Sequence, residues 1–121
     1  MKIQESAENY LETILILYQR NGKVRSIDIV NELAFTKPSI SVAMKKLRES
    51  GHITVKNGGF IELTPLGRRV AETMYERHHL LSGWLMSLGV DEAVAAEDAC
   101  RIEHVISQES FEKIRAHVLQ Q

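Results

Sequence analysis

Apolar residues recur at helical spacing along most of the chain, and one stretch switches to the alternation expected of a β-hairpin. The helical spacing predicts helices over residues 6–19, 27–34, 38–50, 65–87, 92–106 and from residue 108 onward. The alternating stretch predicts strands over residues 52–56 and 60–63. The predicted order is therefore three helices, a hairpin and three further helices. In the second helix, Ile27, Val30 and Leu33 are expected to face the core.

Residues with strong preferences for helix ends and turns mark the boundaries of these elements. Side chains that can accept hydrogen bonds from the first turn of a helix, and so cap it, are supplied by Ser6, Ser26, Thr64, Asp91 and Ser107. Pro38 suits the first turn of the third helix, with Thr36 or Lys37 at its cap. Asn57-Gly58 predicts a tight hairpin turn, because both residues accept positive φ.

This order of elements predicts a mostly α fold class. Helix, turn, helix and hairpin in succession are typical of a winged helix-turn-helix, here over residues 1–64, followed by a helical domain over residues 65–121. The winged helix is a common DNA-binding design, but some winged helices bind proteins instead. The order of elements favours DNA binding without excluding protein binding.

The third helix has the surface chemistry of a DNA-reading helix. Ile40, Met44 and Leu47 form its inward face, which leaves small polar and basic residues on the other faces. Serine can bond base edges or phosphates, proline and valine can touch a thymine methyl, and lysine pairs with phosphates. With one lysine from the hairpin, the predicted DNA contacts are Thr36, Pro38, Ser39, Ser41, Val42, Lys45, Lys46 and Lys56. The alternative is that the lysines are only solvated surface charges.

Composition restricts where this protein works and how it binds DNA. The 121 residues carry a net charge of -1, so DNA binding requires a local basic face. No stretch approaches the roughly 18 apolar residues of a membrane span, and the first ten residues contain no apolar signal core. We therefore expect a cytoplasmic protein with no membrane partner. A single cysteine excludes an internal disulfide framework.

Residues that commonly bind metals gather on three of the predicted helices. Cys100, Glu103 and His104 stand at spacings of three and four, which places a thiol, a carboxylate and an imidazole on one helical stripe. Other helices add Glu8, Asn9, Glu12, His78 and His79. Each piece alone is also typical of a solvated face or a buried cysteine. An enzyme is disfavoured, because one helix rarely aligns a thiol and an imidazole on a substrate, and no oxyanion-forming glycine loop is present.

The chain resembles the iron- and manganese-dependent repressors of the diphtheria toxin repressor family over essentially its whole length. The motifs that carry the resemblance are ENYLETI (8–14), KPSIS (37–41), LTPLG (63–67), RHHLL (77–81), LGVD (88–91) and DACRIEHVIS (98–107). The resemblance implies a two-domain, manganese-regulator-like homodimer whose domain over residues 65–121 binds metal and dimerises. It further implies that operator DNA is bound when metal is plentiful.

The resemblance also implies a ligand set for that metal. The positions that match family ligands are Glu12, His78, Cys100, Glu103 and His104, with Asn9 as a further candidate. Cys100 is typical of the iron branch, whereas Glu12 is typical of the manganese branch. At Asn9 the manganese branch has Asp and the iron branch has Met. The expected cofactor is therefore Mn(II) or Fe(II), without a choice between them.

The sequence accordingly predicts a metal-dependent, DNA-binding repressor of metal-ion homeostasis genes. Two alternatives remain at this point. One is a winged-helix transcription factor that senses a ligand other than a metal. The other is a protein-binding winged helix.

Overall fold

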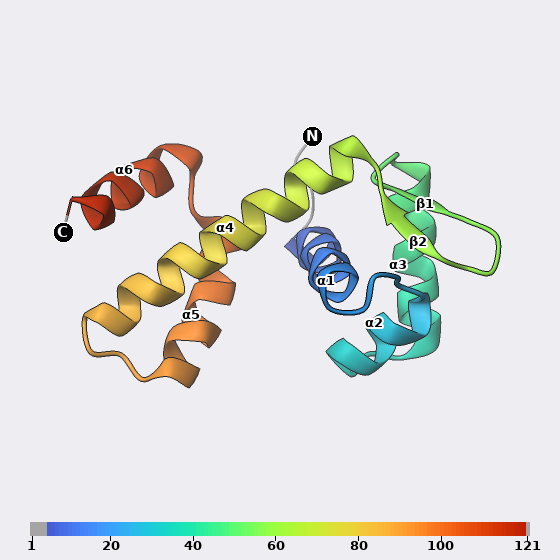
Figure 1. Cartoon of the computed structure of the whole chain (residues 1–121), viewed down its shortest axis with the longest axis horizontal. Helices are drawn as coiled ribbons and strands as arrows, with labels where there is room; N and C mark the ends of the chain where they lie inside the picture. The colour runs from blue at the N-terminus through green and yellow to red at the C-terminus, as the bar shows by residue number, and fades with distance from the viewer. Residues whose placement is uncertain (1–4, 121) are drawn as a thin grey trace. The chain divides into compact units, whose positions relative to one another are not determined.

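The structure is a computed structural model that describes residues 5–120. It divides into two compact units, residues 1–72 and residues 73–121, and the predicted mostly α fold is confirmed. The elements, in chain order, are α1 (Glu5–Asn21), α2 (Ser26–Leu33), α3 (Lys37–Glu49), β1 (Ile53–Val55), β2 (Ile61–Leu63), α4 (Pro65–Ser87), α5 (Glu92–Val105) and α6 (Gln108–Leu119). Helix α4 begins in the first unit and continues into the second (Figure 1).

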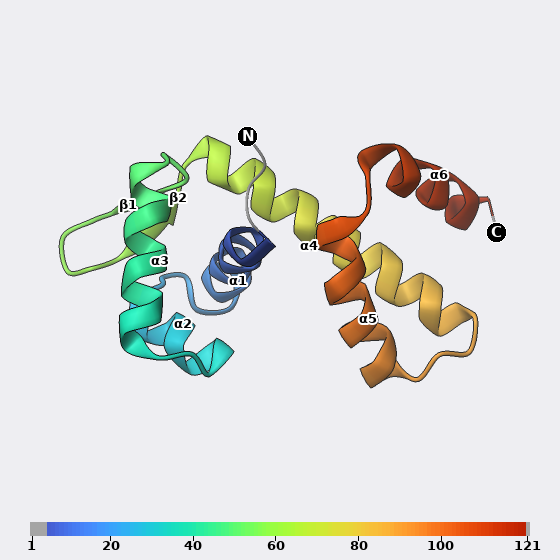
Figure 2. The ribbon, with the colours of Figure 1, turned by 180° about the vertical axis from the view of Figure 1, so that it is seen from behind.

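The first unit is the winged helix-turn-helix that the element order predicts. Helices α2 and α3 pack together, and the β1–β2 hairpin lies beside α3 in both views (Figure 1, Figure 2). The strands are antiparallel, with Ile53 paired to Leu63 and Val55 to Ile61. The fully buried apolar side chains of this unit include Leu11, Ile14, Leu15, Val24, Ile29, Ile40, Ile53 and Ile61. Burial of these residues, which come from α1, α2, α3, both strands and the loop before α2, stabilises the helices and the wing around one core.

The start of α2 differs from the sequence prediction by one residue. Arg25, not Ser26, is the N-cap, and its backbone N–H donates to the Asp28 carboxylate at 2.9 Å. The capping bond is thus accepted by the side chain of the third helical residue, Asp28, and it satisfies the backbone N–H of the N-cap residue. The inward face also differs: Ile29 is fully buried, whereas Ile27 is 42% exposed.

The hairpin turn uses different residues from those predicted. Positive φ occurs at Gly58 and Gly59, and Asn57 is not among the residues with positive φ. The turn is closed by hydrogen bonds from Gly59 N–H to the Lys56 carbonyl at 3.0 Å and from Lys56 N–H to the Phe60 carbonyl at 2.7 Å. Glycine occupies left-handed backbone without the steric cost of a Cβ, so the pair of positive-φ positions lies one residue later than predicted, at Gly58-Gly59 in place of Asn57-Gly58.

The first turns of α4 belong to the first unit, and Thr64, the residue before α4, is bonded to the segment between α3 and β1. Thr64 Oγ1 donates to the Gly51 carbonyl at 2.6 Å and accepts from Gly67 N–H at 3.1 Å. The Thr64 N–H donates to the His52 carbonyl at 3.1 Å. The compact unit therefore extends to Glu72, into the helix that the sequence assigned wholly to the following domain.

The second unit is a helical assembly of the rest of α4 with α5 and α6. Its core is formed by Leu81, Ala99 and Phe111, one from each helix. Partly buried apolar side chains packed on this core are Leu80, Trp84, Ile102, Ile106 and Ile114. The predicted caps are confirmed: Asp91 accepts from Ala93 N–H at 3.1 Å, and Ser107 accepts from Ser110 N–H at 3.1 Å.

Candidate metal centre and nucleic-acid interface

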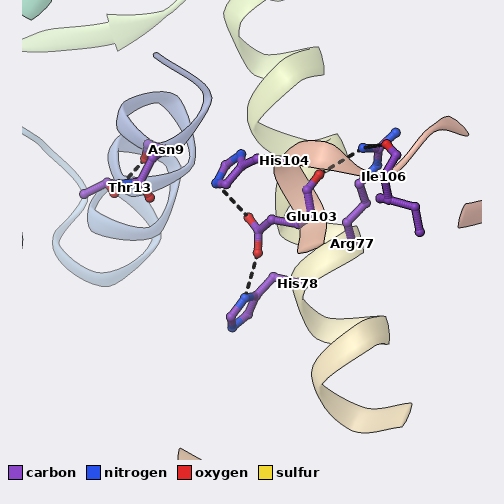
Figure 3. A network of polar contacts seen from close by, with 7 residues as sticks. All are labelled: Asn9, Thr13, Arg77, His78, Glu103, His104 and Ile106. Carbon is purple, nitrogen blue, oxygen red and sulfur yellow. Dashed lines mark hydrogen bonds and ion pairs between the residues drawn. The ribbon is translucent and has the colours of Figure 1, made fainter. Parts of the chain in front are cut away.

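One buried carboxylate lies between two imidazoles in the second unit. Glu103, on α5, is fully buried, and its Oε1 lies 2.8 Å from Nδ1 of His78 on α4. Its other oxygen, Oε2, lies 3.7 Å from Nε2 of His104, whose side chain is 3% exposed (Figure 3). His78 remains 28% exposed and is the more accessible imidazole. Packing of α4 on α5 thus brings together three of the predicted ligands from two helices.

The chemistry of these three side chains fits a divalent transition metal. A buried carboxylate is costly unless a positive charge or hydrogen bonds compensate it, and a metal ion would supply that charge. Carboxylate oxygen and imidazole nitrogen are donors that Mn(II) and Fe(II) accept. Among the described residues of the second unit, no three such side chains bring one ligand atom each within 4.8 Å of one another.

Cys100 lies near this group along the chain but is solvent-exposed. It stands one turn before Glu103 and His104 on α5. It does not join Glu103 and His104 in a three-residue group within 4.8 Å. His79, the neighbour of His78, is also exposed, and its ring lies 4.3 Å from that of Tyr75.

The two remaining predicted ligands lie on α1, in the first unit. Glu12 is only 6% exposed, which is unusual for a carboxylate. Asn9 is half-buried, one turn earlier, and its backbone carbonyl accepts a hydrogen bond from Thr13 Oγ1 at 2.8 Å (Figure 3). Asn9 and Glu12 are spaced by three residues and so lie close to one another on the helix surface.

Arg77 is a buried residue of this region that sequence reasoning missed. It precedes His78 on α4, and its guanidinium donates to the backbone carbonyl of Glu103 at 2.9 Å (Figure 3). Met74, Arg77 and Leu81 are all buried, so the arginine occupies a position on the apolar stripe of α4. A charged residue in phase with an apolar stripe is the sequence pattern that would have identified it.

The predicted DNA contacts lie on the exposed side of α3 and in the wing. Ile40, Met44 and Leu47 are buried, and Thr36 caps the helix by accepting from Ser39 N–H at 3.3 Å. The residues of the predicted set that α3 exposes are Pro38, Ser39, Ser41, Val42, Lys45 and Lys46. Lys56 is exposed in the wing, 3.8 Å from the Glu62 carboxylate. The structure therefore leaves the whole predicted set open to a partner.

A hollow of about 710 Å³ runs along α3 within the first unit. Side chains at the start of α1, on α3 and just after α3 line it: Ser6, Ala7, Tyr10, Pro38, Ser39, Val42, Ala43, Lys46, Leu47, Ser50 and His52. Four of the predicted DNA contacts thus share one concave surface. The part of the chain that the structure describes contains no helix long and apolar enough to cross a membrane.

Comparison with known proteins assigns each unit a function. The family profile described as "Iron dependent repressor, N-terminal DNA binding domain" matches residues 2–59. The profile "Iron dependent repressor, metal binding and dimerisation domain" matches residues 64–120. Transcriptional regulator MntR of Salmonella typhimurium is 31% identical over 117 residues, which cover 97% of this chain and 74% of that protein. The chain belongs to the diphtheria toxin repressor family.

Other members of the diphtheria toxin repressor family share its sequence or fold. HTH-type transcriptional regulator MntR of Lysinibacillus sphaericus is 31% identical over 109 residues, covering 90% of this chain and 78% of that protein. The solved structure "Manganese-dependent transcriptional repressor complex with manganese" is 28% identical with a TM-score of 0.83. It covers 93% of this chain, which spans 52% of its length. "Structure of the manganese regulator SloR", at 24% identity and a TM-score of 0.84, covers all of this chain, which spans 56% of that one, and supports the fold.

Membership of the family confirms the main sequence predictions. The protein is a metal-dependent, DNA-binding transcriptional regulator and not an enzyme. Residues 2–59 match the family's DNA-binding domain, and residues 64–120 match its metal-binding and dimerisation domain. The rival assignments to a protein-binding or non-metal-sensing winged helix are correspondingly disfavoured.

Proposed function

We propose that the protein represses metal-ion homeostasis genes by binding operator DNA as a homodimer when Mn(II) or Fe(II) is bound. The observation that carries this proposal is the buried Glu103 carboxylate held between His78 and His104 in the family's metal-binding domain. Its place of action is the cytoplasm, because its target is chromosomal DNA.

The proposed metal site uses His78, Glu103 and His104 as its central ligands. Glu12 adds a second carboxylate and Cys100 a thiolate, in keeping with the family resemblance. Asn9 is the weakest donor, because an amide oxygen carries no net charge. Side chains of this mixed oxygen, nitrogen and sulfur type favour first-row divalent ions over Mg(II) or Ca(II).

Metal binding would activate DNA binding mainly by preorganisation. The proposed ligands come from α1, which belongs to the DNA-binding unit, as well as from α4 and α5, so one ion would restrict the motion of that unit. Metal-free protein must lose conformational entropy when it binds DNA. Metal-loaded protein has already lost that entropy on binding the ion, so its DNA affinity is higher. The coupling is reciprocal, so operator DNA should raise the metal affinity by the same factor.

The proposal is tested by measuring operator affinity with and without metal. DNA selected from a random library by Mn(II)-loaded protein serves as the operator. Anaerobic titrations with Mn(II), Fe(II), Co(II) and Zn(II) then rank the ions, and fluorescence anisotropy measures DNA affinity in each state. We expect tight operator binding only with metal. Equal operator affinity of the metal-free and loaded protein would refute metal control.

The contribution of Cys100 can be checked by substitution with serine. If its thiolate binds metal, the Co(II) complex of the native protein shows an intense thiolate charge-transfer absorption band, and Cys100→Ser lacks it. Metal affinity should fall by roughly tenfold or more, because a soft anionic donor is lost. Identical Co(II) spectra for the two proteins would exclude Cys100 from the ligand set.

The contribution of α3 to DNA binding is measured by its salt dependence. Lys46→Gln removes one exposed positive charge, so the slope of log affinity against log salt concentration should fall by about 0.9, the value for one lost phosphate contact. Lys113→Gln makes the same charge change at an exposed position of α6 and should leave the slope unchanged. An unaltered slope in Lys46→Gln would remove this residue from the interface.

A further inference from the structure

Arg77 is a buried cation that joins the three helices of the second unit. It is 8% exposed, and its Nη1 donates to the backbone carbonyls of Glu103 at 2.9 Å and Ile106 at 3.1 Å. Its Nη2 donates to Oε1 of Gln108, the first residue of α6, at 2.8 Å. The guanidinium carbon lies 5.5 Å from the centre of the Phe111 ring. One side chain from α4 thus donates hydrogen bonds to the end of α5 and to the start of α6.

The carbonyls that Arg77 contacts are those that a helix end leaves without an intrahelical partner. Helix α5 ends at Val105, so the Glu103 carbonyl is in its last turn and the Ile106 carbonyl lies just beyond. Such carbonyls carry the negative end of the helix dipole, and a buried cation there is favourably placed. The backbone at Glu103 is therefore held by a charge-assisted hydrogen bond from a neighbouring helix.

Two adjacent residues of α4 hold the same residue of α5. Arg77 binds the Glu103 backbone, while His78 binds the Glu103 carboxylate at 2.8 Å. Together these contacts fix both the main chain and the side-chain end of Glu103 relative to α4. Without the hydrogen bond from Arg77, the backbone of the last α5 turn would be free to move. The His78–Glu103 hydrogen bond alone would then have to keep the carboxylate in place.

We propose that Arg77 is a positioning residue for the metal site: it sets the register of α4 against α5 and so fixes the Glu103 carboxylate beside His78. This inference rests on the proposed metal-binding function. Arg77 does not itself ligate metal, because a guanidinium has no lone pair to offer at physiological pH. It acts through Glu103, as groups behind a metal ligand commonly do.

The geometry requires arginine rather than any cation. Its planar fork directs donors on separate nitrogens toward α5 and α6, while its central carbon lies over the Phe111 ring. Lysine presents its donors from a single nitrogen and cannot reproduce the fork. Arg77→Lys should therefore keep the charge but retain only part of the metal affinity that Arg77→Met loses.

A second arginine near the same ring supplies a matched control. Arg115 also lies 5.5 Å from the Phe111 ring centre, but its Nη1 pairs with the exposed Glu76 carboxylate at 3.1 Å. Arg115→Met removes a cation from Phe111 without touching the Glu103 backbone. A second variant, Gln108→Met, leaves Arg77 in place but removes the acceptor of its Nη2, so it loosens the guanidinium without deleting it.

The first readout uses metal-free protein. The ¹⁵N and ¹H resonances of the His78 imidazole report its hydrogen bond to Glu103, and circular dichroism confirms folding. We expect these resonances to shift in Arg77→Met and to a smaller extent in Gln108→Met, and to remain native in Arg115→Met. Native His78 resonances in folded Arg77→Met would overturn the inference. If Arg77→Met does not fold, native resonances in Gln108→Met would overturn it.

The second readout is Co(II) affinity together with the Co(II) absorption spectrum, which is sensitive to ligand geometry. We expect Arg77→Met to weaken Co(II) binding about tenfold or more with an altered spectrum, Arg77→Lys to lie between it and native, and Arg115→Met to match native. Native Co(II) affinity and a native Co(II) spectrum in Arg77→Met would refute the positioning role of Arg77 but not the proposed metal site. Failure of native protein to bind Co(II) would instead defeat the proposed metal site, and the metal-free readout would then decide the positioning of Glu103.

Discussion

Glu103→Gln is expected to abolish metal-dependent operator binding while leaving the protein folded. Glutamine has nearly the same shape as glutamate and can still hydrogen bond to His78, so the buried position remains filled. What it loses is the negative charge that a divalent ion requires from a buried ligand. The loss in Mn(II) affinity should exceed the roughly 10–100-fold typical of residues that only support a ligand.

Loss of DNA binding follows from the loss of metal. If loading raises operator affinity, Glu103→Gln should show the metal-free operator affinity at every Mn(II) concentration used for the native protein. Calorimetry measures metal binding and anisotropy measures operator binding. Glu92→Gln makes the same chemical change at an exposed position of the same helix and should behave as native. Native Mn(II) affinity in Glu103→Gln would exclude Glu103 as a central ligand.

Gly67→Ala is expected to destabilise the first unit by about 3 kcal/mol. A Cβ at residue 67 would overlap the backbone carbonyl oxygen of His52 and lie 2.9 Å from the carbonyl carbon. That carbonyl also accepts the Thr64 N–H, so the overlapping atoms are backbone atoms held by a hydrogen bond and cannot rotate away. Relief would require α4 to move off the hairpin, which would break the bonds made by Thr64.

Urea unfolding followed by circular dichroism measures this effect at one fixed protein concentration, since dimerisation also contributes to stability. Gly83→Ala is the matched control, because Gly83 lies in the same helix, is exposed, and has no neighbouring atom within 4 Å of an added Cβ. That substitution should stabilise by about 0.5–1 kcal/mol through helix propensity. Equal stability of the two variants would show that the approach of Gly67 to His52 is not a tight constraint.

Arg77 and Gly67 show the kind of information that local sequence patterns lack. Arg77 contacts the carbonyl of a residue 26 positions later, and Gly67 is required by the backbone carbonyl of His52, which lies between α3 and β1. Nothing within either residue's own turn of helix reveals these contacts. The apolar stripe of α4 marks Arg77 as an inward position, and the motifs RHHLL and LTPLG mark the neighbourhood of Arg77 and Gly67, but none of these patterns gives the physical role of either residue.

The sequence by itself determined the starts of the last four helices, the winged order and the candidate ligands, whereas α1 begins at Glu5, before the predicted Ser6 cap. Thr36, Thr64, Asp91 and Ser107 cap their helices as predicted, because a capping side chain acts on N–H groups two or three residues away. The same local character explains why the exposed residues of α3 could be named in advance. Once Ile40, Met44 and Leu47 are taken as the inward face, helical periodicity assigns the rest.

Only the tertiary structure decided which of these side chains meet. His78 and Glu103 are 25 residues apart, and their contact depends on the packing of Leu81, Ala99 and Phe111. Tertiary packing likewise buried Ile29 rather than Ile27, exposed Cys100, and extended the first unit to Glu72. The physical reason is that capping and periodicity act within one or two turns, whereas burial and ligand geometry depend on surfaces contributed by distant segments.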